Sequence, residues 1–328
     1  MFWVIAVIHM SAYVRQQQIV PHEYLRCISI CALSLFTFIS GYFLSGKTES
    51  LSDIGKFYCK RLKRFFPLFL LSAVSLYILH LTVRKFSHVT SVDQLIYTVT
   101  GTACFINKAP ATLWYISMLM FFYLLTPFIN IAHRPAVKII ICVVTEGILL
   151  TGVFLGISDE RPALYFPSYA AAMMISGRIR LREGFNVWVF LAGTAASFAA
   201  VLIDVRITNL ATDILVSFVL PVPVMELSKL LSYKKAGALF GYISYASMCA
   251  YLFHRQFFGL ILAKFGKVDI LVFECIIFPV FLVICYFMQK LYDRIVFAAE
   301  GSKKSKRIRS EKIQKQKILM KRKIENGK

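Results

Sequence analysis

Long apolar runs, separated by short polar and charged connections, repeat along nearly the whole chain. Most of these runs approach the roughly 20 residues that an α-helix needs to cross the hydrocarbon of a bilayer. The pattern therefore predicts an all-α, polytopic transmembrane helix bundle. Its ten expected spans are 1–14, 27–46, 65–83, 113–131, 138–157, 163–179, 186–204, 210–231, 237–262 and 269–289. The shorter apolar segment 95–106 is expected to be a re-entrant or surface piece.

The composition supports this assignment and the charges orient it. Apolar residues make up 58% of the 328 residues, against about 45–50% in a soluble domain. With the N-terminus inside, the inside connections hold 28 Lys and Arg and the outside connections nine. Cytoplasmic connections carry such an excess, so both termini are expected to be cytoplasmic.

Two regions are expected, a transmembrane bundle over 1–292 and a basic cytoplasmic tail over 293–328. From Glu300 onward the tail holds twelve Lys and Arg against three Glu. After a membrane bundle, such a tail indicates contact with anionic lipid rather than nucleic acid. The eight cysteines are scattered without ligand spacing, so neither a metal site nor a disulfide framework is predicted.

A basic cluster, made of Lys60, Arg61, Lys63 and Arg64, directly precedes Phe65-Phe66-Pro67 and an apolar run. It can serve as the cytoplasmic anchor of a span. It can also bind an anion, because Arg61 and Arg64 are three residues apart and share one helix face. Guanidinium groups suit phosphate oxygens. Pro67 is expected to disturb the helix there and to free backbone groups near the charges.

Several polar or aromatic residues within apolar runs are candidates for chemistry. His9 lies deep in the first run and is either a proton-transferring base or a histidine that bonds a neighbouring helix. The group Ser40, Gly41 and Tyr42 favours a close helix contact through the glycine.

The pair Trp114 and Tyr115, followed by Tyr123, is typical of residues that anchor a span at the head groups. His254 and Arg255 place polar groups in apolar surroundings. Three in-span carboxylates are candidate partners for Arg255 or the histidines, namely Glu146, Asp213 and Glu226.

Together these segments resemble the integral-membrane acyltransferase-3 family of bacteria, which O-acylates sugars of surface polysaccharides and related lipids. The resemblance covers nearly the whole bundle. It rests on His9, Phe-Ile-Ser-Gly-Tyr-Phe-Leu at 38–44, the segment 57–67, the motifs at 113–116 and 122–127, and the motif at 243–254.

The chain departs from this family at two places. The family usually has an Arg or Lys upstream of the first-span histidine, and this sequence begins too late to contain one. We expect the reading frame to extend upstream and to encode it, since Met1–Val14 is short for a span. Many members also carry a Glu where Leu119 stands, so no role of that Glu is transferred to this chain.

The resemblance implies a membrane O-acyltransferase in the bacterial cytoplasmic (inner) membrane. Its donor substrate would be acetyl-CoA or another acyl-CoA, held by Arg61 and Arg64, and no cofactor would be permanently bound. His9 would be the central base, and the acceptor would be a glycan or a lipid-linked sugar. Ser40, Gly41, Tyr42, Trp114, Tyr115, Tyr123 and His254 would support the site. The alternative is a polysaccharide or amphiphile transporter or flippase without transferase chemistry.

Overall fold

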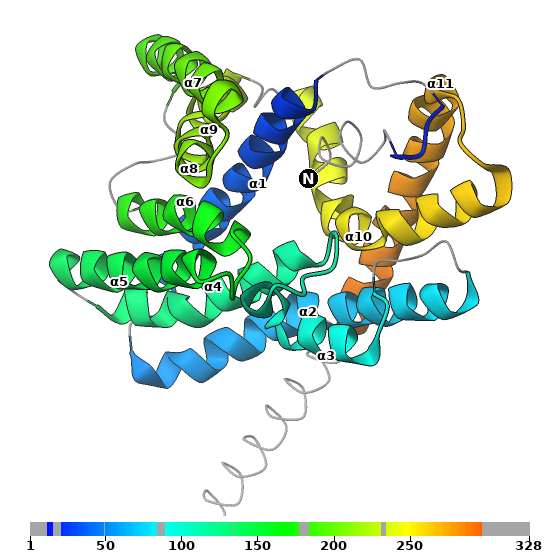
Figure 1. Cartoon of the computed structure of the whole chain (residues 1–328), viewed down its shortest axis with the longest axis horizontal. Coiled ribbons are helices and arrows are strands. Elements are labelled where there is room, and N and C mark those ends of the chain that lie inside the picture. Colours follow the sequence, from blue (N-terminus) through cyan, green and yellow to red (C-terminus); the bar gives the residue numbers. More distant parts are fainter. Residues whose placement is uncertain are drawn as a thin grey trace, which may run out of the picture.

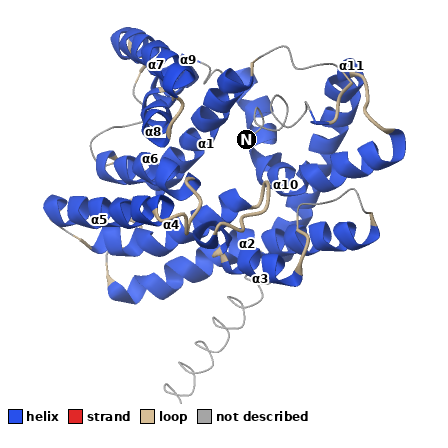
Figure 2. Ribbon diagram, in the orientation of Figure 1, coloured by secondary structure: helices blue, strands red, loops and turns tan. Residues whose placement is uncertain are grey.

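The computed structural model describes residues 12–15, 21–48, 50–83, 89–132, 134–176, 184–230 and 234–296. The described part of the chain is 84% helical and contains no strand beyond an isolated bridge between Val14 and Val268 (Figure 2). This confirms the all-α prediction. The α-helices are α1 (His22–Leu44), α2 (Leu51–Thr82), α3 (Val92–Thr100), α4 (Trp114–Ile131), α5 (Pro135–Phe154), α6 (Arg161–Ile175), α7 (Val187–Ile207), α8 (Leu210–Val219), α9 (Pro221–Leu230), α10 (Lys234–Phe265) and α11 (Ile270–Val272).

Among the described residues, seven helices are long and apolar enough to cross a membrane. They are His22–Leu44, Leu51–Thr82, Trp114–Ile131, Pro135–Phe154, Val187–Ile207, Leu210–Leu230 and Ile270–Val296. The last of these, hereafter the last helix, begins with α11 and contains a π-helical stretch, η4 (Phe273–Ile277). The remaining predicted spans fall on the 15-residue α6, on the 32-residue α10 and on 1–14. The count of ten therefore stays a prediction.

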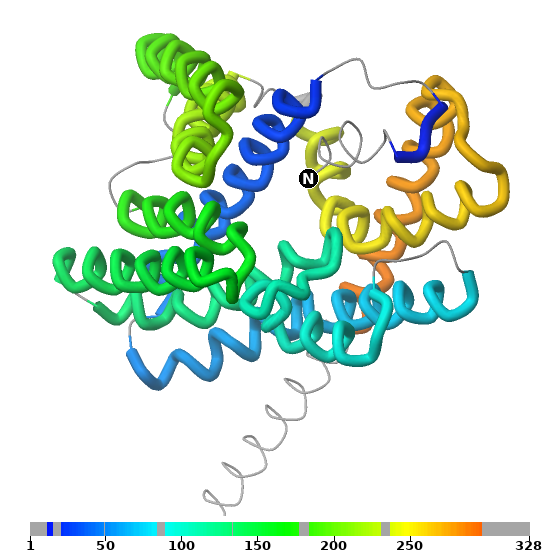
Figure 3. Tube along the Cα trace, viewed as in Figure 1, coloured from blue at the N-terminus to red at the C-terminus, as the bar shows by residue number. Residues whose placement is uncertain are grey.

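The helices form two groups joined by α1, α2 and α4 (Figure 1). Helices α7, α8 and α9 pack together beside α1 and α6, whereas α10 packs against α2. The tube in Figure 3 shows α10 and the last helix together, at the side of the molecule opposite α7. The residues that resemble the family motifs lie mainly on α1, α2, α4 and α10, which meet in the middle.

Gly41 allows the closest approach between α1 and α6. A Cβ at this position would lie 2.5 Å from the carbonyl oxygen of Tyr169. Two side-chain bonds reinforce the contact, since Ser45 Oγ donates to Met173 O at 3.0 Å and Ser168 Oγ donates to Ser34 O at 3.3 Å. The expectation of a close helix contact through Gly41 is confirmed.

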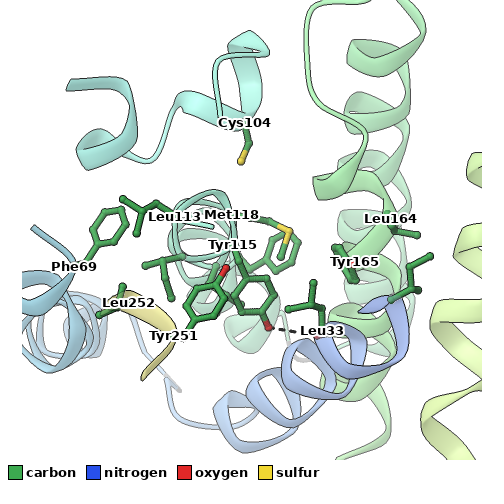
Figure 4. Packing of buried hydrophobic residues seen from close by; sticks show 14 of the residues in the cluster. Leu33, Phe69, Cys104, Leu113, Tyr115, Met118, Leu164, Tyr165, Tyr251 and Leu252 are labelled. Atoms are coloured by element: carbon green, nitrogen blue, oxygen red, sulfur yellow. Dashed lines mark hydrogen bonds between the residues drawn. The ribbon is translucent and has the colours of Figure 1, made fainter. Parts of the chain in front are cut away.

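The core is aromatic where α1, α4, α6 and α10 meet. Tyr115 is fully buried, its hydroxyl donates to Leu33 O at 3.3 Å, and its ring lies 5.8 Å from that of Tyr251 (Figure 4). Phe122 packs on the other side against Tyr169 at 5.1 Å between centroids. Such rings bury large areas and hold a fixed geometry.

The segment expected to be re-entrant or superficial forms α3 and the short 3₁₀ helix η3 (Ala103–Ile106). Helix α3 has nine residues, too few to cross a bilayer. Its N-cap Ser91 accepts from the backbone N–H of Gln94 at 3.1 Å. Ser117 Oγ on α4 donates to Thr98 O at 3.1 Å, so the segment packs against the bundle.

A buried ion cluster joins α1 to α7 and α8. Arg26 bonds the carboxylates of both Asp204 and Asp213, and Thr212 donates to Asp204 at 2.5 Å. Among the described residues, Asp213 therefore pairs with Arg26 rather than with Arg255 or a histidine. Glu226 likewise pairs with Lys229, at 2.5 Å. Sequence showed that these carboxylates were costly to bury, but it did not identify their partners.

Candidate active site

An inner cavity of about 370 Å³ lies between α1, α2, α4 and α10. It brings together five of the residues singled out in the sequence, which come from three separate helices. These are Ser40, Arg61, Arg64, Tyr115 and Tyr123. Leu119 lines the same cavity and makes this part of the wall apolar.

Arg61 is half-buried beside aromatic rings. Its guanidinium carbon lies 5.8 Å from the ring centroid of Phe57 and 6.0 Å from that of Tyr123. The Tyr123 side chain is hydrogen-bonded to Ser40. Cation–π contacts of this kind hold a guanidinium in place without neutralising it. The wall therefore presents a positioned positive charge to the cavity.

Helix α2 continues through Pro67, which lies inside it. Because proline has no N–H, it cannot bond the carbonyl four residues earlier, which belongs to Lys63. The Tyr292 hydroxyl of the last helix donates to that oxygen instead. The expectation that Pro67 frees a backbone group near the basic cluster is confirmed, although the helix does not end there.

A second, larger hollow, the basic cleft, lies between α2, α10 and the last helix, with a volume of about 1050 Å³. Its α2 wall is formed by Lys56, Cys59, Lys60, Lys63 and Arg64. Its other walls include Ser244, Tyr245, Ser247, Met248, Gln289, Tyr292 and Asp293. Arg64, Ser247 and Met248 line both the basic cleft and the inner cavity, so the two hollows adjoin.

One carboxylate of the basic cleft is fixed by its neighbours. Tyr245 OH donates to Asp293 Oδ2 at 2.6 Å, and Gln289 Nε2 donates to Asp293 Oδ1 at 3.1 Å. Both oxygens of Asp293 therefore have partners that are not lysines. Among the described residues that line the basic cleft, the α2 cations outnumber the carboxylates, so the cleft favours an anionic ligand.

Trp114 lies outside the inner cavity lining, against other aromatic and charged groups. Its ring stacks on Tyr165 at 5.9 Å, and Arg161 lies 4.6 Å from its centroid. Arg161 is also held by Asp159, whose backbone N–H donates to Cys104 O at 2.8 Å. Burial next to Asp159 raises the pKa of the Cys104 thiol to about 12, so this thiol stays protonated. Trp114 therefore packs outside the cavity, and its supporting role in the site stays a prediction.

His254 is fully buried next to the cavity wall and does not line the cavity. Its Nδ1 lies 2.8 Å from the carbonyl oxygen of Tyr251, which does line it. Tyr251 and Arg255 both bond Thr112, through its carbonyl and its hydroxyl. Thr112 has φ of 90°, a strained value for a β-branched residue. This part of α10 fixes the turn that precedes α4.

The remaining predicted residues are placed as follows. Gly41 serves the α1–α6 contact, and Tyr42 packs edge-on against Phe43 at 5.5 Å. Neither residue lines the inner cavity. His9 lies outside the described residues, as does the basic tail beyond Val296, so their predicted roles stay predictions.

Sequence reasoning missed the contribution of the last helix. Gln289, Tyr292 and Asp293 are spaced i, i+3 and i+4, which puts them on one helix face. That spacing of polar groups at the end of an apolar run was a usable signal. It could not show that this face meets α2, because the two segments are far apart in sequence.

The comparisons with known proteins identify the family of this chain. A family model described as an acyltransferase domain matches residues 1–289. No curated protein and no solved structure matches the chain significantly. The matched region contains both hollows except the end of the last helix, and seven of its described helices can cross a membrane. This chain belongs to the acyltransferase-3 family and is a multi-pass membrane acyltransferase.

Proposed function

We propose that this protein moves an acyl group, with acetyl as the first candidate, from a cytoplasmic acyl-CoA to a hydroxyl of a cell-surface glycan or its lipid-linked precursor. The proposed location is the bacterial cytoplasmic membrane. The observation that carries the proposal is the convergence of Arg61, Arg64 and Tyr123 on one cavity that adjoins a basic cleft. A polyanionic donor with a slender reactive end fits such a pair of hollows.

The size of the inner cavity supports its role as the reaction chamber. Its volume of about 370 Å³ is at the small end of ligand pockets, which span roughly 300–1,000 Å³. The acyl thioester and part of its arm fit that space better than a whole nucleotide does. Tyr115, Tyr251 and Leu119 give it an apolar wall that restricts water, which would protect a thioester from hydrolysis.

In the proposed reaction, His9 is the central base. It takes the proton from the acceptor oxygen, which attacks the thioester carbonyl carbon. The new C–O bond forms, the C–S bond breaks, and the sulfur of CoA leaves with the bonding electron pair and takes up a proton. The acceptor at this step is either the sugar hydroxyl or an intermediate acceptor group. Arg61 and Arg64 hold donor phosphates through their guanidinium forks.

The charge distribution supports the cytoplasmic entry of the donor. The basic cluster lies in a connection that the Lys and Arg bias assigns to the inside. An acyl-CoA is a cytoplasmic metabolite with several phosphate charges, so it would meet the basic cleft first. The acceptor would then approach from the opposite side of the bundle.

The direct test is incubation of the purified full chain with acetyl-CoA labelled in the acetyl group. Binding, followed by release of free CoA in the presence of a glycan acceptor, is expected. Mass spectrometry of surface glycans from cells with and without the gene would then give the acyl mass and the acceptor. A protein that changes glycan export but neither binds nor consumes acetyl-CoA would be a flippase, and the proposal would be wrong.

A further inference from the structure

The basic cleft carries positive charges beyond the two arginines that line the inner cavity. Lys56, Lys60 and Lys63 are spaced i, i+4 and i+7 on α2 and line one wall, with Arg64 beside them. Lys56 also lies 3.5 Å from Asp53 in an exposed pair, which neutralises it little. An anchor for a span needs only net charge in the connection. It does not require that the charges line a hollow.

We infer that the basic cleft binds the phosphorylated nucleotide end of the donor, while only the thiol arm passes Arg64 into the inner cavity. This inference rests on the proposed function and deepens it. It assigns the 3′-phosphate and adenosine to α2, α10 and the last helix. Lys60 and Lys63 become donor-binding residues, and the last helix becomes part of the donor site.

The size and continuity of the two hollows support this division. The basic cleft, with about 1050 Å³, lies at the upper end of ligand pockets and has room for an adenosine with its phosphates. The inner cavity has about a third of that volume. Their shared wall of Arg64, Ser247 and Met248 is where the pyrophosphate would give way to the arm.

The other walls of the basic cleft suit a nucleoside. Tyr245 and Tyr292 are both half-buried and both line it, and aromatic rings stack on bases. Their hydroxyls are engaged, by Asp293 and by Lys63 O, so each ring is held in one orientation. A surface that merely attracted head groups would need neither fixed rings nor an oriented carboxylate among its cations.

The lysines and the arginines suit different phosphates of the donor. Lysine acts as a compact point charge toward phosphate, whereas arginine binds it through a planar fork. Lys60 and Lys63, both exposed to solvent, suit a 3′-phosphate at the open end. Arg64, at the junction, suits the pyrophosphate. Arg61 lines the inner cavity but not the basic cleft, so it suits the pyrophosphate oxygens nearest the arm, on the phosphate that adenosine 3′,5′-bisphosphate lacks.

The experiment uses adenosine 3′,5′-bisphosphate, a probe that has the nucleotide end but neither arm nor acyl group. The full chain is placed in nanodiscs of neutral lipid, and the probe is titrated against bound labelled acetyl-CoA. Competition is expected with the wild-type protein. The Lys60→Gln/Lys63→Gln variant should bind the probe at least tenfold more weakly, because charge-assisted contacts are lost.

The matched control is Lys47→Gln/Arg134→Gln. It removes the same charge from exposed positions that the orientation places on the same side but that do not line the basic cleft. Its affinity for the probe should stay within twofold of wild type. An equal loss in both double variants would reduce the effect to general electrostatic attraction and overturn the inference.

Two further outcomes separate the possible failures. If acetyl-CoA is bound and consumed but the probe does not compete, the nucleotide assignment is wrong and the proposed function survives. If acetyl-CoA itself is neither bound nor consumed, the proposed function fails. Repeating the titration in nanodiscs with anionic lipid tests the other source of phosphate. Loss of probe binding there, with acetyl-CoA binding retained, would make the basic cleft a lipid head-group site.

Discussion

The Tyr292 hydroxyl donates a hydrogen bond to the carbonyl oxygen of Lys63, the backbone acceptor that Pro67 leaves without its helical partner. This bond ties the last helix to α2 in the middle of the basic cluster. Tyr292 and Lys63 both line the basic cleft, so the bond holds the last helix against α2 at the wall of that cleft.

Replacing Tyr292 by Phe should lower stability by about 1 kcal/mol, the usual net contribution of one hydrogen bond. The Pro67→Ala variant restores an N–H for the Lys63 carbonyl, so Tyr292→Phe should cost less in that background. The measurement is thermal unfolding in detergent of the two single variants and the double variant. Additive effects would show that the two residues are not coupled.

A suitable control for the tyrosine is Tyr242→Phe. The Tyr242 ring lies 5.1 Å from that of Tyr286, and within the described part of the chain its hydroxyl makes no hydrogen bond. The same chemical change should therefore leave the melting temperature nearly unaltered.

Substitution by alanine should affect stability differently at Gly41 and at Gly147. A Cβ at Gly41 would clash with Tyr169 O, whereas nothing lies within 4 Å of one at Gly147 on α5. We expect Gly41→Ala to destabilise the fold by about 1–3 kcal/mol through overpacking. Gly147→Ala should be neutral or slightly stabilising. Equal stability of both variants would contradict the close α1–α6 contact.

Local rules predicted the features that depend on one stretch of chain. The sequence predicted that Pro67 frees a backbone carbonyl, that Gly41 permits a close helix contact, and that the apolar runs form helices. The partners could not be predicted in the same way. The contact of Tyr292 with Lys63 and the contacts of Asp213 with Arg26 depend on how separate helices pack. No periodicity within one segment encodes that packing. The pair of Glu226 with Lys229 is local, because the two residues are three apart on α9.

Removing Arg26 should destabilise the fold strongly, by about 3–5 kcal/mol, because the buried Asp204 and Asp213 would lose their shared cation. The Arg26→Ala/Asp213→Asn variant should recover part of the loss, since one uncompensated charge disappears. Thermal unfolding, followed by size-exclusion chromatography, measures the stability of the single and of the double variant. A double variant less stable than Arg26→Ala would argue against charge as the cause.

His9→Ala should reduce acyl transfer by about 10²–10⁴-fold, the usual contribution of a general base. Expression and membrane insertion should be unaffected. His22→Ala is the control. Because His22 is exposed at the start of α1, this variant should transfer the acyl group at the normal rate. Near-normal transfer by His9→Ala would remove the histidine from the proposed mechanism.

Replacing both Arg61 and Arg64 by Lys separates donor binding from membrane orientation. The change keeps every positive charge, and Lys47, Lys56 and Lys60 remain nearby, so the orientation signal is retained. It removes the planar forks and the guanidinium that lies beside Tyr123. Acetyl-CoA affinity should fall by about 1.5–3 kcal/mol, roughly ten- to a hundredfold, in calorimetry. Normal insertion with unchanged affinity would leave the basic cluster as an anchor alone.

The single variants refine the test. Arg64→Lys should weaken the nucleotide probe as well as acetyl-CoA, whereas Arg61→Lys should weaken acetyl-CoA only, because Arg61 does not line the basic cleft.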